Sequence, residues 1–518
     1  MYEGLRDIVP EFCNFGYDII EYVGWALFFE YRTVQQIMAA LMEKNVTISD
    51  REITYLGKKF IFYLAQAHKD KSPEIKQLLL ALGGYILHFD ATCDGDSPHL
   101  LCAIAETVDL VLGSVKVPSE NTQAVVNFLT KIKEQYGAPL AGVSDMLKAN
   151  LAAFEIVFPG IRHFVCHFHF LRDIGKDMME YDYATLRDGL KRYGTQTRLR
   201  EISRKLREAV NSDDITLIDS ISKQGLKALS KLPNHLAAYV LIEWIRNFES
   251  ELHGYGFPFD QSYLVLFQRM REAHQILSEV PPDVQEFLEL KAFLGNVVGD
   301  PDLQHVVALL QKKSTDFNQL REAMRIAQPD GKEGLNDNGE ESDMATIEKA
   351  VMAFIERDEI KNSTDMSYQK MVQQIKKYQD KLFADPIDIT IPGGEKIKIY
   401  PQRTNNLLER FFRELNRGSR KRNGCKSLGR TLQTMLAETP IVKNLQNPEY
   451  VKIILNGKPS LAARFAEVDA AQIRGDMRNS QHQEEKLPAS VKKIIKIEDL
   501  PKLLLDSVSK RIASTVAA

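Results

Sequence analysis

Short apolar runs separated by turns fill the stretch between residues 85 and 170. Three of these runs predict consecutive strands at Tyr85–Cys93, His99–Glu106 and Leu110–Val117. The pattern then alternates, predicting a helix at Ser119–Gly137, a strand at Pro139–Asp145, a helix at Met146–Phe158 and a strand at Ile161–Phe168. Strands followed by alternating helix and strand indicate an α/β sheet with a meander at one edge.

The first 80 residues have helical spacing instead. Apolar positions mark the inner faces of two successive helices, at Val34, Ile37, Met38 and Leu41 and then at Ile53, Leu56 and Phe60. Ser49 followed by Glu52 predicts a capping box at the second helix. Polar and basic residues are expected on its outer face, at Arg51, Thr54, Tyr55, Lys58 and Lys59. The pair fits a helix-turn-helix DNA reader that uses Arg51 and Lys58; a helical pair packed on the next domain is the alternative.

Helical spacing also dominates residues 177–385, which we expect to form an all-helical insertion. Within it, Pro329–Asp343 holds six acids and one lysine without an aromatic residue, and predicts a disordered loop. A hairpin at Ile387–Tyr400 and a helix at Arg403–Gly424 are expected next. The resulting segments are 1–80, 81–176, 177–385, 386–438 and a helical tail at 439–518.

Composition and charge narrow the class of protein slightly. The 518 residues allow two to four domains, and the formal net charge of -3 leaves nucleic-acid binding to local basic clusters. Five scattered cysteines without a C-x-x-C pair favour a reducing compartment over a disulfide framework. We expect no membrane partner, because no charge-free apolar run approaches the length of a span and the N-terminus lacks a signal-peptide pattern.

Two aspartates stand at chemically unusual places in the predicted sheet. Asp90 lies in the middle of an apolar strand, where burial of a carboxylate is costly unless it is paired or bound to metal, and Asp145 ends a later strand. A capping or turn-stabilising role is the alternative for each acid alone. Asp94 and Asp96 are rival acids, but their place in a predicted turn favours solvated side chains.

A basic helix follows much later in the chain. Leu408, Phe411, Phe412 and Leu415 mark its inner side, and Glu409 borders that stripe. Between Pro401 and Arg430, nine Lys and Arg residues stand against two Glu, a net charge of +7. This excess predicts a phosphate-bearing neighbour for the basic side chains Arg410, Arg413, Arg417, Arg420, Lys421 and Arg422.

The ordered set of motifs resembles the DDE transposases of the Mutator-like (MULE) group and their bacterial relatives. That set comprises an Asp within a strand, an Asp ending a later strand, a C-x-x-H, and N-N-x-x-E followed by basic residues. The resemblance covers roughly residues 84–177 and 403–424. It maps the acidic residues onto Asp90, Asp145 and Glu409, and the C-x-x-H onto Cys166 and His169.

The resemblance implies a ribonuclease H-like catalytic sheet split by a large helical insertion, together with a helical N-terminal region. It further implies that the three acids bind two Mg²⁺ or Mn²⁺ ions about 4 Å apart and catalyse cleavage and joining of phosphodiesters. The partners would be the double-stranded DNA of transposon ends and target, bound by a homo-oligomer in the bacterial cytoplasm (nucleoid-associated) or in a eukaryotic nucleus. One departure from the family is the absence of a cysteine-rich zinc module at either end.

Other interpretations stay open at this stage. The chain could be a non-catalytic DNA-binding protein derived from a transposase, or a nuclease or resolvase of the same fold. On a strand, His163, His167 and His169 would share one face and Cys166 the other; a helix beginning near His167 would instead turn Cys166 and His169 the same way. A core brace is the favoured role there, with zinc as the alternative. Trp244 could stack on an unpaired base, although core packing is the more common role of such a residue.

Overall fold

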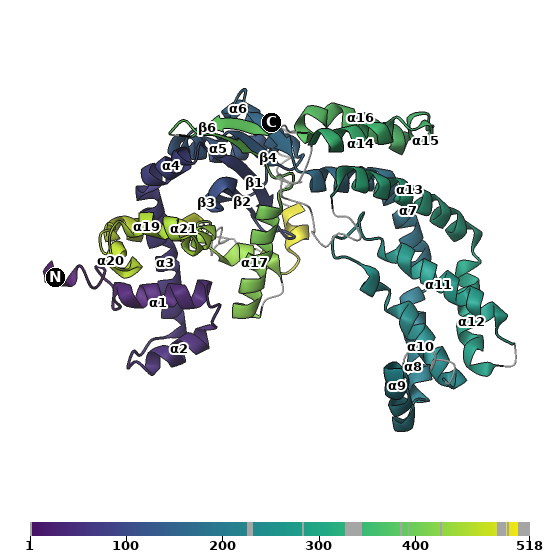
Figure 1. Ribbon diagram of the computed structural model, residues 1–518. Coiled ribbons are helices and arrows are strands. Elements are labelled where there is room, and N and C mark those ends of the chain that lie inside the picture. Colours follow the sequence, from purple (N-terminus) through teal and green to yellow (C-terminus); the bar gives the residue numbers. More distant parts are fainter. Residues whose placement is uncertain are drawn as a thin grey trace, which may run out of the picture. The chain divides into compact units, whose positions relative to one another are not determined.

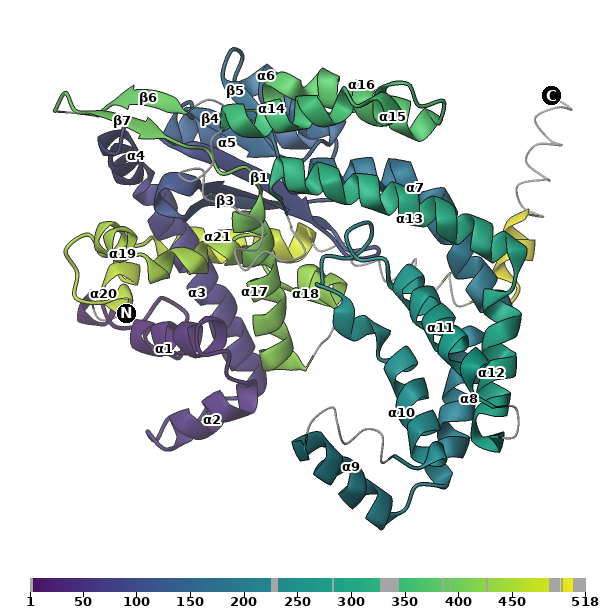
Figure 2. The same ribbon diagram turned by 45° about the vertical axis from the view of Figure 1, so that its right-hand side comes forward.

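The computed structural model describes residues 3–224, 232–281, 284–326, 344–383, 386–391, 393–424, 427–483, 494 and 497–505. It is a mixed α/β structure, with 67% of the residues helical (Figures 1 and 2). Two compact units are present. The first consists of Met1–Ser72, Gly418–Gly424 and Leu445–Ala518, and the second of Pro73–Arg417 and Cys425–Asn444. The predicted catalytic segments and the predicted helical insertion fall in the second unit, apart from Gly418–Gly424.

A five-stranded mixed sheet forms the centre of the second unit. Its strands are β1 (Ile86–Thr92), β2 (His99–Ala105), β3 (Leu110–Val117), β4 (Ala141–Ser144) and β5 (Arg162–Val165), and their order is β3-β2-β1-β4-β5. The pairs β1–β2 and β2–β3 are antiparallel, whereas β1–β4 and β4–β5 are parallel. The α/β class and the meander at one edge are therefore confirmed.

The last predicted strand, at Ile161–Phe168, is twice as long as the observed strand, which has four residues. Strand β5 ends at Val165, and helix α7 (His167–Arg192) starts two residues later with Cys166 as its N-cap. The amide of His167 donates to the carbonyl of Arg403 at 2.8 Å, so the chain has left the sheet at this point. The alternation of side-chain types continues past the end of the strand, and the predicted strand is too long for this reason.

Two helices, α5 (Thr122–Tyr136) and α6 (Lys148–Val157), pack against the sheet. Phe154 of α6 stacks on Phe89 of β1 with ring centroids 5.9 Å apart. Gly142 of β4 permits this close approach, because a Cβ there would lie 2.3 Å from the Phe154 ring. The apolar stripes that predicted these helices are the faces that they bury.

The secondary-structure elements described in the predicted all-helical region are all helices, joined by loops. Helix α7 and helix α13 (Pro301–Met324) run side by side in both views (Figures 1 and 2). The other helices of this region are α8 (Thr195–Glu208), α9 (Ser212–Gln224), α10 (Asn234–Arg246), α11 (Ser262–Glu279), α12 (Gln285–Val298), α14 (Met344–Ile355), α15 (Asp358–Lys361) and α16 (Met366–Leu382), with one 3-10 turn at Phe248–Glu251. The predicted loop at Pro329–Asp343 lies outside the described residues.

A predicted hairpin and a predicted basic helix complete the second unit. Strands β6 (Ile387–Thr390) and β7 (Lys396–Ile399) pair antiparallel, which confirms the hairpin. Helix α17 (Asn406–Asn423) buries Leu408, Phe411 and Phe412 as expected, and the boundary between the two units falls within it. Helices α4 (Ser72–Ala81) and α18 (Leu428–Thr434) and the 3-10 elements at Glu106–Val108 and Thr439–Gln446 account for the remaining elements.

The edge strand β3 is covered by the segment after α18. The side chain of Asn444 pairs with the backbone of Val111, accepting from its N–H at 2.7 Å and donating to its carbonyl at 2.8 Å. Ser114 Oγ donates to the carbonyl of Ala437 at 2.7 Å. An amide side chain thus takes the place that a sixth strand would occupy beside Val111.

The first unit is helical in its described residues. It contains a 3-10 turn at Glu3–Leu5 and helices α1 (Tyr17–Phe28), α2 (Val34–Met42), α3 (Asp50–Asp70), α19 (Pro448–Leu455), α20 (Leu461–Phe465) and α21 (Ala470–Gln483). Ser49 caps α3 by accepting from the Glu52 amide, which is one of the two hydrogen bonds of the predicted capping box. Lys59 is not on the outer face: it is 4% exposed and donates to Cys13 Sγ at 3.1 Å. Of the predicted helical tail at 439–518, residues 484–493, 495–496 and 506–518 lie outside the described residues.

No helix in the described part of the chain is both long and apolar enough to cross a membrane.

Candidate active site at the carboxyl ends of strands β1 and β4

Strand register places the two predicted aspartates side by side. His88 of β1 pairs with Val143 of β4 in parallel register, so two residues further on Asp90 comes level with Asp145. Ser144 in turn pairs with Val165 of β5, which brings Cys166 to the same level. Side chains at the carboxyl ends of parallel strands meet at one edge of a sheet, where α/β proteins commonly bind ligands.

Asp90 is a buried carboxylate, with 8% of its surface exposed. Its Oδ1 accepts from the Ala91 amide at 2.8 Å and its Oδ2 from Asn405 Nδ2 at 3.0 Å. Burial raises the pKa of Asp90 to about 7; the charge of His169 opposes this rise, and Asp145 and Glu120 add to it. The site therefore disfavours negative charge on Asp90 unless a cation is near.

Asp145 shares a hydrogen-bond donor with a second acid, Glu120. Asn150 Nδ2 donates to Asp145 Oδ1 and to Glu120 Oε1, at 2.8 Å in each case. Burial raises the pKa of Glu120, and the charge of Asp145 adds to this rise. Glu120 thus belongs to the same acidic cluster as the two aspartates.

Glu409 reaches this edge from the first turn of α17, but its carboxylate pairs with an imidazole. His169 Nε2 lies 3.2 Å from Glu409 Oε1. The hydrogen bond from His169 lowers the pKa of Glu409 against the effect of burial, and the charges of His169, Arg172 and Arg413 lower it further. Within the described residues, no group of three or more His, Cys, Asp or Glu side chains is arranged to hold a metal ion.

The start of α7 settles the open geometry of the Cys/His segment. Because the helix begins at His167, Cys166 and His169 are turned the same way, and Cys166 is one of the groups that raise the pKa of His169. Burial opposes charge on His169, but Cys166, Glu409 and Asp90 outweigh it and raise its pKa well above the usual value. His163 stays on the strand, where it hydrogen-bonds Ser144 Oγ at 2.9 Å and burial lowers its pKa to about 3.

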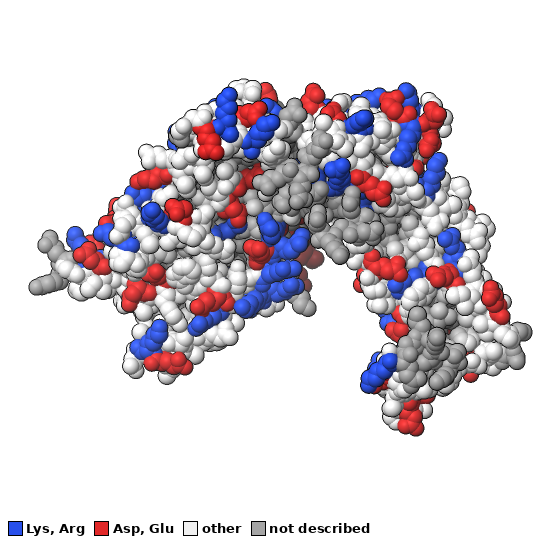
Figure 3. All heavy atoms as spheres, in the orientation of Figure 1, with Lys and Arg blue, Asp and Glu red and all other residues white. Residues whose placement is uncertain are grey.

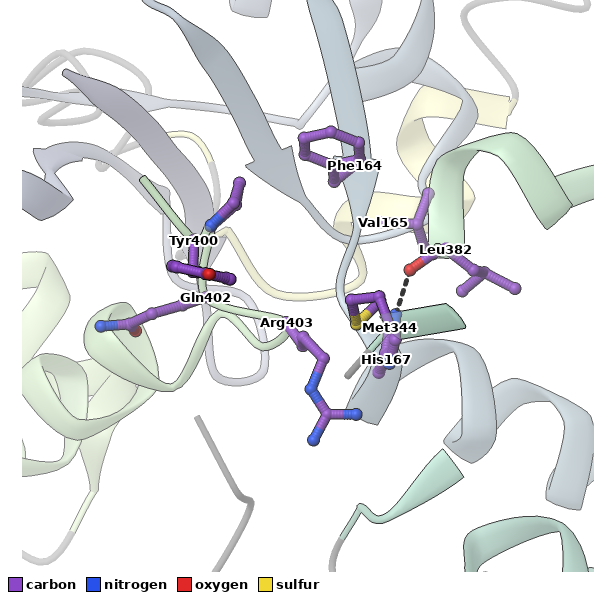
Figure 4. A pocket seen from close by; sticks show the side chains of 9 residues that line it. Phe164, Val165, His167, Met344, Leu382, Tyr400, Gln402 and Arg403 are labelled. Carbon is purple, nitrogen blue, oxygen red and sulfur yellow. Dashed lines mark hydrogen bonds between the residues drawn. The ribbon is translucent and has the colours of Figure 1, made fainter. Parts of the chain in front are cut away.

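The segment that delivers Glu409 is fastened at three points, two of which involve Arg403; Figure 4 shows the Arg403 side chain near His167. Two are backbone contacts of the segment itself, the bond from the His167 amide to the Arg403 carbonyl and a 3.2 Å bond from the Asn405 amide to Cys166 Sγ. The third is the buried Arg403 guanidinium, which donates to the carbonyl of Met324 at 2.8 Å at the end of α13. His167 lies beside this segment and donates to the Leu382 carbonyl at 2.5 Å.

The basic residues of α17 form an exposed surface. Figure 3 shows blue side chains gathered where Figure 1 draws this helix. The exposed members are Arg410, Arg413, Arg417, Arg420 and Lys421. Arg422 is half-buried, with its guanidinium 5.4 Å from the centre of the Phe28 ring, so it is less available to a ligand. In the first unit, Arg51 is exposed and Lys58 is half-buried.

The structure also places three other candidate residues, Trp244, Asp94 and Asp96. Trp244 is half-buried against the helical core, and the Arg269 guanidinium lies 4.8 Å from its ring centre. This packing supports the core role for the tryptophan. Asp94 accepts a 2.9 Å bond from the Gly429 amide, and Asp96 is exposed.

Sequence patterns missed four residues of this site: Glu120, Asn150, Asn405 and His88. Asn405 stands within the N-N-x-x-E motif, and His88 lies two residues before Asp90 and hence on the same face of β1, so both had a usable signal. Glu120 resembles an ordinary acid at the start of a helix, and Asn150 an ordinary polar residue within one. Nothing in their local sequence indicated the contact between them.

Comparison with known proteins adds no assignment, since no protein-family model and no curated protein matches the chain.

Proposed function

We propose that the protein is a DDE-type DNA transposase that cuts transposon ends and joins them to target DNA. The observation that carries this proposal is the closeness of Asp90, on β1, to Asp145, which directly follows the neighbouring parallel strand β4 and whose charge raises the pKa of Asp90. Glu409 arrives at the same edge after an interval of 264 residues (409 minus 145), most of them helical. This order and spacing match what the resemblance to Mutator-like transposases implies.

The strand order supports a ribonuclease H-like fold for the sheet. Three consecutive antiparallel strands are followed by two parallel strands, with the first strand in the centre. Such an arrangement puts the first and fourth strands side by side. It is the sheet that we expected from the family.

The donor atoms at this edge suit a hard divalent cation such as Mg²⁺ or Mn²⁺. Carboxylate oxygens are the preferred ligands of these ions, and the mutual repulsion of Asp90, Asp145 and Glu120 would be relieved by positive charge. Asp90, Asp145 and Glu409 would hold the proposed pair of ions. When bound, the ions would activate an attacking hydroxyl and stabilise the leaving oxygen.

Residues of the protein itself would bind the DNA backbone and hold Glu409 in place. Five exposed basic side chains on α17 lie on the helix that carries Glu409, so a phosphate backbone bound there would approach the acids. His169 holds Glu409 in a defined position. We propose that the protein acts as a homo-oligomer on double-stranded DNA, in the nucleoid of a bacterium or in a nucleus.

A reaction on defined DNA ends tests the proposal. The substrates are duplexes that carry the inverted repeats flanking the gene, offered uncut and pre-cut, with a second duplex as target. In Mg²⁺ or Mn²⁺, wild-type protein should cleave the uncut duplexes and join the pre-cut ends to the target duplex. Asp90→Ala, Asp145→Ala and Glu409→Ala should each lose both reactions, whereas Asp96→Ala, a change at an exposed acid, should retain them.

The outcomes separate the three candidate functions. Cleavage without joined product, across metals and salt concentrations, favours a nuclease or resolvase. Joining that survives Glu409→Ala removes this residue from the site. The pairing of Glu409 with His169 favours, as the second candidate, a non-catalytic DNA-binding protein derived from a transposase. Binding of the repeats with no cleavage in any metal is the result expected for that protein.

A further inference from the structure

A chain of buried hydrogen bonds runs from Glu106 to Asp90. Glu106 Oε2 lies 2.8 Å from His88 Nε2, and His88 Nδ1 lies 2.9 Å from Asn405 Oδ1. The Asn405 amide continues the chain, since its Nδ2 is 3.0 Å from Asp90 Oδ2. His88 and Asn405 are completely buried, so water does not compete for these bonds.

Donor and acceptor chemistry gives the chain a fixed direction. Asn405 Nδ2 faces two acceptors, Asp90 Oδ2 and the Phe89 carbonyl at 3.3 Å, and must therefore be the donor. Its Oδ1 is then an acceptor, so His88 Nδ1 carries a hydrogen. On the far side, Glu106 also accepts from the Gln402 amide at 3.2 Å, which holds it against His88 Nε2.

We infer that His88 is a positioning residue for the proposed active site, because it fixes the Asn405 amide in the one orientation that donates to Asp90. This inference rests on the proposed function. Without a donor at Nδ1, the amide could turn over and present its oxygen to the carboxylate. Asp90 would then lose the bond that orients Oδ2, and its affinity for a divalent cation would fall.

Two substitutions of similar polarity distinguish this role from a general need for a polar group at position 88. The amide nitrogen of asparagine falls near the place of histidine Nδ1, and that of glutamine near the place of Nε2. His88→Asn therefore keeps the donor to Asn405 and gives up the contact with Glu106. His88→Gln keeps the contact with Glu106 and gives up the donor to Asn405.

Mn²⁺ affinity, measured by electron paramagnetic resonance on the full chain, is the first readout, and the thermal midpoint Tm is measured beside it. His88→Gln should bind Mn²⁺ about tenfold more weakly than wild type, and His88→Asn should recover most of that loss at a similar Tm. Asn405→Ala should match His88→Gln, and it serves as the second variant if one His88 variant does not fold. Cleavage rates should follow the same order.

Asp90→Ala is measured in parallel, so that the two ideas can fail separately. If Asp90→Ala loses Mn²⁺ affinity while His88→Gln binds like wild type, this inference is overturned and the proposed function stands. Equal losses in His88→Asn and His88→Gln also overturn it, because the position of the donor would not matter. Mn²⁺ affinity unchanged by Asp90→Ala removes Asp90 from the site and overturns both.

Discussion

His169 Nε2 stands 3.2 Å from Glu409 Oε1, and this pair joins the first turn of α7 to the first turn of α17. The two residues are 240 positions apart (409 minus 169). Their pKa values move in opposite directions, that of His169 upward and that of Glu409 downward, as expected when both are charged. The pair therefore both stabilises the fold and fixes the third acid.

Replacement of this histidine should give a pH-dependent loss of stability. Because the folded pKa of His169 is raised, its stabilisation is complete below the unfolded value of about 6.5 and disappears as pH rises through the folded value. His169→Gln should lower the free energy of unfolding by about 2 kcal/mol at pH 6 and by less at high pH. Urea unfolding in EDTA from pH 6 to 10 measures this, with exposed His305→Gln as the control. If the difference in the free energy of unfolding between wild type and His169→Gln does not narrow at high pH, the assignment of charge to His169 is wrong.

Asp90 should destabilise the metal-free protein above neutral pH. Its folded pKa of about 7 lies above the ordinary value of 3.8, so the cost of its charge develops between about pH 4 and pH 7 and is complete above that range. Asp90→Asn should raise the free energy of unfolding by about 2 kcal/mol at pH 8 and by nearly nothing at pH 4. Unfolding in EDTA at both pH values tests this, with exposed Asp96→Asn as the control. Equal effects of Asp90→Asn at the two pH values would show that its carboxyl is not the titrating group.

Glu120 should contribute to cation binding although the motifs omit it. It shares the Asn150 donor with Asp145, and its charge raises the pKa of Asp90. Glu120→Gln should weaken Mn²⁺ binding about tenfold with little change in Tm. The matched control is Glu134→Gln, an exposed change on α5. Unchanged Mn²⁺ affinity would confine Glu120 to a structural role.

The basic face of α17 should bind DNA through phosphates. Changing Arg413, Arg417 and Arg420 together to Ala should weaken binding of any duplex. It should also reduce the slope of log affinity against log salt by about 2 to 3. The reason is that binding releases counterions from the DNA, and the variant makes three fewer phosphate contacts. Fluorescence anisotropy across a salt series measures the slope. A control variant with Lys396, Lys398 and Lys377 changed to Ala should keep the wild-type slope. An equal reduction of the slope in both variants would mean that net charge, and not a binding face on α17, determines the salt dependence.

Arg403 should connect the stability of the helical region to the position of Glu409. Its guanidinium donates to carbonyls at the end of α13, and its backbone is held by the start of α7. Arg403→Met leaves those buried carbonyls without their donor and should cost about 2 kcal/mol. Unfolding by urea measures the loss, with exposed Lys396→Met as the control. A variant as stable as wild type would mean that the carbonyls find other donors.

Local patterns located the strands of the sheet but not their order. Apolar runs bounded by turns located all five of its strands, and the neighbouring placement of Asp90 and Asp145 follows from the strand order. The end of β5 was misplaced because alternation continues through His167 and His169, which belong to a helix. Where a strand ends depends on its partner strand, and a single segment does not contain that information.

Contacts between segments far apart in the chain could not be predicted from the sequence, and the reason is physical. His88 and Asn405 are 317 residues apart, and neither segment by itself indicates the contact between them. Helical spacing placed Lys59 on the outer face, yet the Cys13 thiol and the Tyr55 ring contact its ammonium group. Such contacts depend on which surfaces tertiary packing brings together, whereas periodicity reports only which face of an element is apolar.

The amide pairing of Asn444 with Val111 has a consequence for solubility during folding. An uncovered edge strand exposes a row of N–H and carbonyl groups that can recruit a strand from another molecule. Here the cover comes from residues 435–444, which are synthesised more than 300 positions after β3. Until that part of the chain emerges and docks, the apolar edge Leu110–Val117 is open to self-association. A nascent or truncated chain that ends before residue 435 should therefore depend on chaperones to avoid aggregation.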